Sequence, residues 1–339
     1  MGLRPTARDV ANEAGVSLAT VSLALNGKAG VSDDTRRRVL ATAERLGYQP
    51  RGQRPVIGLL IERLHVPAYS DPAVGVMIQG VESEASRRGY HMLLASIGPE
   101  VTQLPAMVTE RQISGLIVLG GGDISDAYIR GLGATALPLV LADNFVDGLA
   151  VPCVLADNET GGYLATQHLI ALGHTRIAIL EGPRKYKTLT ERLEGYLRAR
   201  DRAGLSPDPT LMVKPLHTSP RKGYRETQAL LALPRWQRPT AIFAISDKTA
   251  LGALDALKDA GVRVPDDMGL VGFDDIAESA HVVPPLTTVH LPMQAIGQVA
   301  VQRLVELIDG AEMLPYKTVL YTDLVVRQSS GACRHAVTA

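Results

Sequence analysis

From residue 56 onward, short apolar runs alternate with segments of helical periodicity, and this alternation restricts the possible folds more than any other feature. The runs include VIGLLI at 56–61, GLIVLG at 115–120 and AIFAIS at 241–246, which are almost free of polar residues. A strand that is apolar on both faces is buried on both faces, as in a parallel sheet covered by helices on either side. The body of the chain is therefore predicted to be α/β.

Two successive series of these elements predict two lobes with parallel sheets. Strands are expected at 56–61, 91–96, 115–120, 137–143, 176–182, 211–216, 241–246 and 268–274, and helices at 72–89, near 100–112, 124–132, 160–172, 188–204, 221–231 and 248–260. Ligands of open α/β sheets bind at the carboxyl ends of the strands. We therefore expect a ligand in a cleft between the lobes.

The first fifty residues have a different pattern, which predicts three short helices. Thr6 caps a helix at 7–14, Ser17 caps a second at 18–25, and Ser32 caps a third whose buried stripe is Val39, Leu40, Ala43 and Leu46. Two short helices joined by Gly-Val-Ser form a helix-turn-helix, whose second helix reads DNA. The alternative is an ordinary three-helix bundle with capping residues.

Charge is distributed unevenly along a chain whose net charge is zero. Residues 1–54 contain nine Lys and Arg but five Asp and Glu, which gives this head a net charge of +4 and the body −4. A basic head predicts contact with a polyanion. The sequence contains no apolar run of about 18 residues, so no membrane span is predicted. The N-terminus does not resemble a signal peptide. Cys153 and Cys333 lack metal-ligand spacing, so we expect reduced thiols, no zinc site and a cytoplasmic protein.

The head resembles the DNA-binding domain of the lactose-repressor (LacI/GalR) family of bacterial transcription regulators. The resemblance runs without gaps from Thr6 to Pro50, over TARDVANEAGVSLATVSLALNG and then VSDDTRRRVLATAERLGYQP. It implies that Leu18, Ala19 and Leu23 face the bases. It also implies that phosphates are bound by Thr6, Ser17, Thr20, Ser22, Asn26, Ser32 and Thr35. The family commonly has arginine where this chain has Leu23, so a bidentate guanine contact is lost.

The linker after the head also departs from the family pattern. The family usually has a short hinge helix here, whereas only residues 51–55 separate Pro50 from the first strand of the body. Gly52 and Pro55 both oppose a helix. We predict that the hinge helix is absent or rudimentary.

The resemblance extends over the body, through HLIALGHTRIAIL, PTAIFAISDKTALGAL and GVRVPDDMGLVGFDDI. These segments resemble the family's effector domains, which have the type I periplasmic-binding-protein fold with three crossings between the lobes. The implied domains are a head at 1–50, an effector-binding and dimerisation domain at 56–330, and a tail at 331–339. The lobes are expected at 56–154 with 287–318, and at 155–286 with 319–330.

Candidate ligand-binding residues come from the predicted strand ends and from the resemblance. They are His65, Tyr69, Asp71, Ser96, Asp143, Arg192, Thr218 (with His217 beside it), Ser246, Asp247 and Asp274. A carboxylate such as Asp274, at a strand end, can accept hydrogen bonds from sugar hydroxyls. Arg192 matches the family position that reaches the ligand, the alternative being a surface salt bridge. Asp247 has a helix cap as its alternative role, and Asp275 is expected to be structural.

The remaining motifs do not indicate catalysis. The segment LGGGD at 119–123 lacks the GxGxxG order of a dinucleotide site, and no nucleophile elbow, Walker lysine or metal cluster is present. We therefore predict a protein without a cofactor that is not an enzyme. The predicted function is a ligand-responsive repressor, binding a pseudo-palindromic operator in double-stranded DNA as a homodimer and responding to a sugar or related metabolite. The alternative is a solute-binding or sensor protein without specific operator binding.

Overall fold

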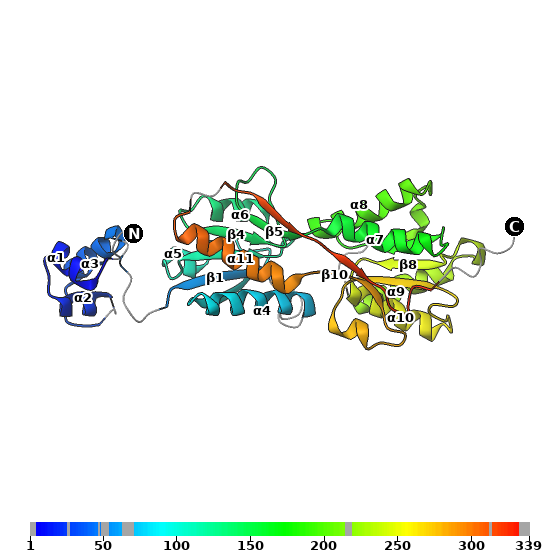
Figure 1. Cartoon of the computed structure of the whole chain (residues 1–339), viewed down its shortest axis with the longest axis horizontal. Helices are drawn as coiled ribbons and strands as arrows, with labels where there is room; N and C mark the ends of the chain where they lie inside the picture. The colour runs from blue at the N-terminus through cyan, green and yellow to red at the C-terminus, as the bar shows by residue number, and fades with distance from the viewer. Residues whose placement is uncertain are drawn as a thin grey trace. The chain divides into compact units, whose positions relative to one another are not determined.

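A computed structural model of the chain describes residues 5–25, 28–46, 48, 54–62, 71–213, 219–311 and 314–331. The chain divides into two units, Met1–Pro55 and Val56–Ala339 (Figure 1). The first unit is the helical head and the second is the α/β body. No helix of the described ranges is long and apolar enough to span a membrane.

The head contains the three predicted helices, α1 (Ala7–Ala14), α2 (Leu18–Leu25) and α3 (Asp33–Leu46). Val10, Val21 and Val39, one from each helix, are almost fully buried at its centre. Helix α1 ends at Gly15, whose φ of 64° is left-handed and therefore suits glycine. The chain turns there and enters α2 three residues later, at Leu18.

The predicted buried stripe of α3 is wrong at Leu40. This side chain is 44% exposed, and Thr42 is buried instead. Residues 39, 42, 43 and 46 follow the i, i+3, i+4, i+7 spacing and share one face of the helix. Leu40 lies one residue from Val39, which rotates it by about 100° away from that face.

The first lobe of the body is a parallel sheet of strand order β11-β5-β4-β3-β1-β2. Its strands are β1 (Val56–Glu62), β2 (His91–Ile97), β3 (Gly115–Leu119), β4 (Leu139–Ala142), β5 (Cys153–Ala156) and β11 (Lys317–Leu320). Helices α4 (Pro72–Arg87) and α11 (Met293–Ile308) pack together on one face (Figure 1). Helices α5 (Ala106–Thr109) and α6 (Asp126–Gly133) cover the other face, α5 being shorter than the predicted helix near 100–112.

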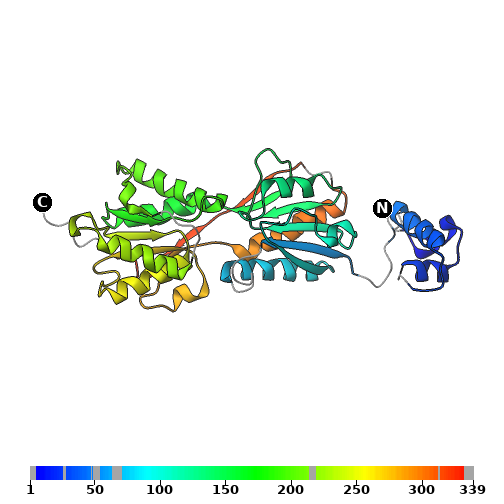
Figure 2. The same ribbon diagram turned by 180° about the vertical axis from the view of Figure 1, so that it is seen from behind.

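The second lobe has strand order β12-β10-β9-β8-β6-β7. Its strands are β6 (Ile177–Leu180), β7 (Met212–Val213), β8 (Ala241–Ala244), β9 (Gly269–Asp274), β10 (Thr287–His290) and β12 (Asp323–Val325). Helices α7 (Asn158–Ala171) and α8 (Lys187–Arg202) cover one face, and α9 (Pro220–Ala232) and α10 (Asp247–Asp259) the other (Figure 2). The predicted parallel sheets are confirmed, and one edge strand of this lobe, β12, runs antiparallel to β10.

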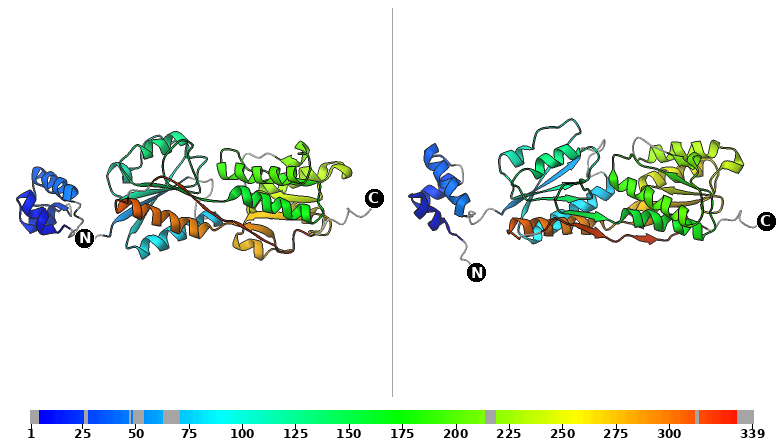
Figure 3. Two further views of the ribbon diagram at one scale, coloured as in Figure 1. Left: turned by 45° about the horizontal axis from the view of Figure 1, so that its top comes forward. Right: turned by 90° about the horizontal axis from the view of Figure 1, so that it is seen from above.

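The chain crosses between the lobes three times, after β5, after β10 and after β11; Figure 3 shows the last crossing in red. The predicted lobe boundaries lie a few residues before the observed crossings. In particular, the prediction places β10 in the first lobe, but β10 pairs with β9 in the second lobe, with Thr287 opposite Val271. The reason is that each strand stays hydrogen bonded to its neighbour until its apolar run ends. The crossing then follows, as at Leu291 and Pro292 after β10.

The predicted absence of a hinge helix stays a prediction, because residues 51–53 lie outside the described ranges. Arg54 and Pro55 form no helix, and β1 begins directly after them at Val56.

Candidate functional site

Helix α2 carries the residues that were predicted to face bases. Leu18 is 46% exposed, and Ala19 and Ser22 are exposed as well, whereas Val21 and Ala24 on the opposite side are buried. Leu23 is less exposed than these three residues. It is half-buried, and its side chain extends toward the backbone near Gly30. The head therefore presents a small, mostly apolar helix face to its surroundings.

The predicted phosphate-binding hydroxyls lie at the N-termini of the three helices. Thr6 and Asp9 form a capping box on α1. Ser17 Oγ accepts the Thr20 amide at 3.0 Å on α2, and Ser32 Oγ accepts the Thr35 amide at 3.4 Å on α3. Helix N-termini attract anions through their amides and their dipole. Asn26, also predicted to bind phosphate, lies outside the described residues.

Arg36 has a structural role that sequence reasoning missed. Its guanidinium donates to the carbonyl oxygens of Ala24 at 3.3 Å and of Lys28 at 2.6 Å. These bonds tie α3 to the C-terminal end of α2. Arg36 thus fixes the angle at which the α2 face is presented.

Arg192, one of the predicted ligand residues of the body, lies in α8 and is buried. Its side chain is 4% exposed, and its Nη1 lies 2.9 Å from Oδ1 of Asp274. The guanidinium also donates to Asn158 Oδ1 at 2.9 Å and to the Ile245 carbonyl at 2.8 Å, and it lies 3.9 Å from the Phe273 ring centroid. The alternative, a surface salt bridge, is wrong because the pair is buried.

A close crossing of α7 and α8 sets the position of Arg192. A Cβ atom on Gly162 would lie 2.1 Å from the Arg192 carbonyl oxygen, and one on Gly195 would lie 2.1 Å from the Glu159 carbonyl. Only glycine permits this approach of two backbones. The crossing brings Arg192 over the end of β9, where Asp274 lies.

Asp143 reaches the same region from the first lobe. It follows β4, has a left-handed φ of 54°, and its buried Oδ1 has no hydrogen-bond partner among the described residues. Burial raises the pKa of Asp143 to about 6, with Arg192 lowering it and Asp274 raising it. An acceptor without a donor, close to a buried Arg–Asp pair, is suited to accept a hydrogen bond from a ligand.

Glu62 is the last residue of β1, and Asp71 directly precedes α4. Asp71 caps α4 by accepting from the Ala73 and Val74 amides, and it pairs with Lys248 of the second lobe. Glu62 accepts the Asp123 amide at 3.0 Å, and burial raises its pKa to about 7. Glu62 was missed, although it ends a strand and the rule that selected Asp274 applies to it equally.

Ser246 and Asp247 do not have the arrangement expected of ligand residues. Ser246 is the N-cap of α10, accepting the Thr249 amide at 3.4 Å. Asp247 is fully buried, and its carboxylate accepts from the Ile276 amide and from the hydroxyls of Ser279 and Thr288. Both of its oxygens are thus used within the protein, so we assign Asp247 a structural role.

Other predicted residues are placed less centrally or are not described. Ser96 is exposed near the end of the edge strand β2. Asp275 binds Arg327 at 2.6 Å and His290 at 3.0 Å, in keeping with the structural role predicted for it. His65, Tyr69, His217 and Thr218 lie outside the described residues. Within the described ranges, no group of three or more His, Cys, Asp or Glu residues could hold a metal ion.

Comparisons with known proteins identify the family of the head and of part of the body. Residues 6–51 match the bacterial regulatory proteins of the lacI family, and residues 166–330 match the periplasmic binding protein-like domain. The chain is 35% identical over 345 residues to the HTH-type transcriptional regulator MalR of Streptomyces coelicolor, with 96% of each chain covered. It is also 35% identical over 338 residues to the HTH-type transcriptional repressor CytR of Escherichia coli, again with 96% of each covered.

Two solved structures resemble almost the whole chain. The complex of the transcriptional regulator CelR with cellobiose has a TM-score of 0.74 and 33% identity, covering 96% of this chain and 100% of that one. The lac repressor dimer bound to operator and the anti-inducer ONPF has a TM-score of 0.72 and 28% identity, covering 97% and 100%.

Proposed function

The chain belongs to the LacI family of bacterial regulatory proteins, and we propose that it represses transcription by binding a pseudo-palindromic operator as a homodimer, with an affinity set by a small-molecule effector. Its named relatives are transcription regulators and repressors, and the chain is not an enzyme. Operator binding would place it in the cytoplasm. The effector we propose is a sugar or a related metabolite.

The proposal of DNA binding rests on the arrangement of the head. Exposed hydroxyl residues cap three helix N-termini, and Leu18, Ala19 and Ser22 form the exposed face of α2. Hydroxyls and helix N-termini suit phosphates, while small apolar side chains suit thymine methyl groups. We therefore propose half-sites that contain T·A pairs, with DNA shape supplying further specificity.

The effector half is supported by the polar residues at the strand ends. We propose that Arg192, Asp274 and Asp143 bind the effector, with Asp71 at the edge of the site. Arg192 is already held in place by Asn158 and Ile245, so it is pre-organised. The relative CelR was solved with cellobiose, and oxygen-rich ligands of that class would offer the hydroxyl donor that Asp143 lacks.

Fluorescence anisotropy with duplexes from the gene's own upstream region tests operator binding. We expect the affinity to fall steeply with salt, the slope of log K against log salt being about −0.9 per phosphate contacted. Ser22→Ala should weaken binding, whereas Ser86→Ala, on α4 of the body, should not. Absence of salt-sensitive binding to any promoter duplex would refute the proposal.

A thermal-shift screen of metabolites tests the effector half independently. A specific ligand raises the apparent stability of the body by mass action, and Arg192→Lys should lose that gain. A ligand that stabilises the chain without changing DNA affinity would instead support the solute-binding alternative.

A further inference from the structure

Three ion pairs join the two lobes within the described ranges, and all have the same polarity. In each, the lysine belongs to the second lobe and the aspartate to the first. The pairs are Lys185–Asp123, Lys187–Asp126 and Lys248–Asp71. We call these six residues the interlobe clasp.

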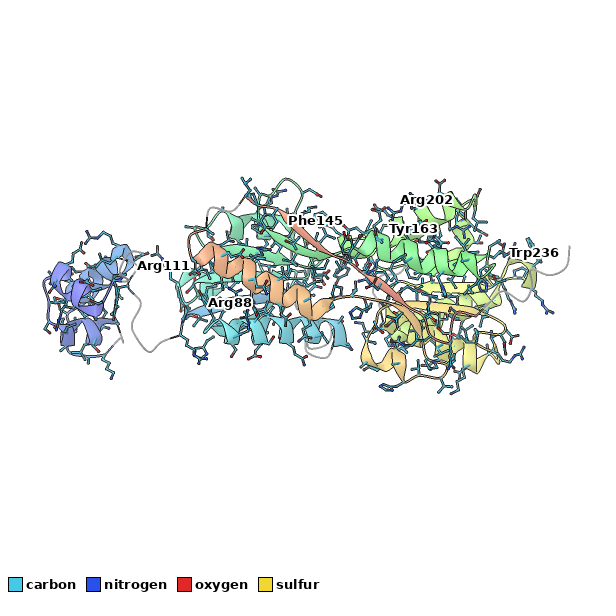
Figure 4. The ribbon with its side chains drawn as sticks, in the orientation of Figure 1. Arg88, Arg111, Phe145, Tyr163, Arg202 and Trp236 are labelled. Atoms are coloured by element: carbon cyan, nitrogen blue, oxygen red, sulfur yellow. The ribbon has the colours of Figure 1, made fainter. Side chains whose placement is uncertain are left out.

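Two of the pairs lie at the start of α8. Lys187 Nζ lies 3.1 Å from Asp126 Oδ2 and 2.8 Å from the carbonyl oxygen of Phe145, and it lies 5.0 Å from the centroid of the Phe145 ring. Phe145, labelled in Figure 4, lies where the first lobe meets the second. Lys187 thus makes three separate contacts with the first lobe.

The glycine-rich segment LGGGD at 119–123, which lacks the glycine order of a dinucleotide site, accommodates this contact. Gly122 has a φ of 127°, and a Cβ atom there would lie 2.5 Å from a ring carbon of Tyr186 in the second lobe. The segment therefore lets the Tyr186 ring approach the backbone of the first lobe. Asp123, the next residue, pairs with Lys185 beside that ring.

The third pair lies on α10, close to the proposed effector residues. Lys248 is 27% exposed and Asp71 13% exposed, and both act electrostatically on Asp274. Glu62, which accepts the Asp123 amide, lies close enough to Asp143 for the two charges to interact. The clasp is thus electrostatically connected with both carboxylates that we propose bind the effector.

We propose that the interlobe clasp holds the lobes together before any effector binds, and that it makes the closed arrangement dependent on ionic strength. Each pair is partly exposed, so each is expected to shift the open–closed equilibrium by about two- to fivefold. Because the three pairs have one polarity, their effects combine. Salt at 0.5 M reduces the screening length to a few ångströms, which weakens these partly exposed pairs and should shift the lobes toward the open arrangement.

The consequence for regulation rests on the proposed function. A ligand shifts an equilibrium only by its different affinity for the two states, and its apparent affinity scales with the population of the competent state. A body already held closed by the clasp would bind its effector more tightly. Replacing the three clasp lysines would weaken effector binding without removing a residue that we propose contacts the effector.

Pulsed electron paramagnetic resonance on the full chain, without effector, tests the clasp directly. Spin labels at Ala134→Cys and Ala203→Cys report one exposed site in each lobe, in a background with Cys333→Ser. The two single-label proteins reveal distances between protomers. The variants are Lys185→Gln with Lys187→Gln, Lys248→Gln, and the matched control Lys258→Gln, an exposed lysine on the same helix as Lys248.

We expect a single short distance at low salt, a longer one at 0.5 M salt, and the longer one at both salts in the clasp variants. Lys258→Gln should match the parent, and the charge swap Lys185→Asp with Asp123→Lys should restore the short distance. Identical distances in parent and clasp variants, or an equal effect of Lys258→Gln, would overturn the proposal. Because no effector or DNA is present, such a result would leave the proposed function intact.

Discussion

Replacing Asp143 with asparagine should stabilise the body of the protein at neutral pH and leave its stability unchanged in acid. The Oδ1 atom of Asp143 is buried without a hydrogen-bond partner among the described residues. Burial raises its pKa from 3.8 to about 6. The folded state therefore resists ionisation of this group, and the cost appears as the pH rises from about 4 through about 6.

The magnitude follows from the pKa shift. A shift of about two pH units corresponds to about 3 kcal/mol. Part of the Asp143 side chain remains accessible to solvent, so we expect the asparagine variant to gain about 1 to 3 kcal/mol above pH 7. For a unit of this size the melting temperature should rise by about 2 to 6 °C.

Differential scanning calorimetry of the full chain between pH 4 and pH 8 measures this effect. The gain should be complete at pH 7.5 and absent at pH 4. Asp275→Asn is the matched control, and it should lose stability at neutral pH because Asp275 is paired with Arg327 and His290. A destabilised Asp143→Asn variant, or a gain that does not depend on pH, would refute the reasoning.

Three further substitutions test the packing, the cap and the base contacts. Gly162→Ala should lower the free energy of unfolding by about 1 to 3 kcal/mol in urea titrations, because the added Cβ meets the Arg192 carbonyl oxygen. Unchanged stability would mean that α8 can move away from α7 without cost. Ser17→Ala should cost the head about 1 kcal/mol by removing the cap of α2, as seen by circular dichroism in the head's melting transition. Leu23→Arg should favour operators with guanine at the facing position by about 1 to 3 kcal/mol, and an unchanged base preference in a binding selection would contradict this.

Much of the fold could be predicted because its signals are local. Continuous apolar runs such as VIGLLI and AIFAIS identified buried strands, and Ser17 and Gly15 marked helix ends within one residue. The family and the two-lobe fold, inferred from motifs, are confirmed by the comparisons. The boundary at β10 was missed because hydrogen bonding to β9, and not composition, decides to which lobe this strand belongs.

The candidate site was less predictable because it depends on which groups meet across the fold. Strand-end position selected Asp143 and Asp274, but it could not show that the hydroxyls of Ser279 and Thr288 donate hydrogen bonds to the Asp247 carboxylate. Those donors lie 32 and 41 residues further along the chain. The ion pairs of the clasp lysines could likewise not be predicted from the sequence, because a lysine near the start of a helix is usually solvated.

The three crossings between the lobes bear on how this protein is made. Strands β11 and β12, at Lys317–Leu320 and Asp323–Val325, are the edge strands of the first and second sheets. The first sheet can therefore be completed only after residues 317–320, and the second only after residues 323–325, have left the ribosome. During synthesis β5 and β10 would each expose an unpaired edge. A nascent chain that stalls before residue 317 would carry two open sheets, and until residues 317–325 are translated it would be exposed to aggregation and to chaperones.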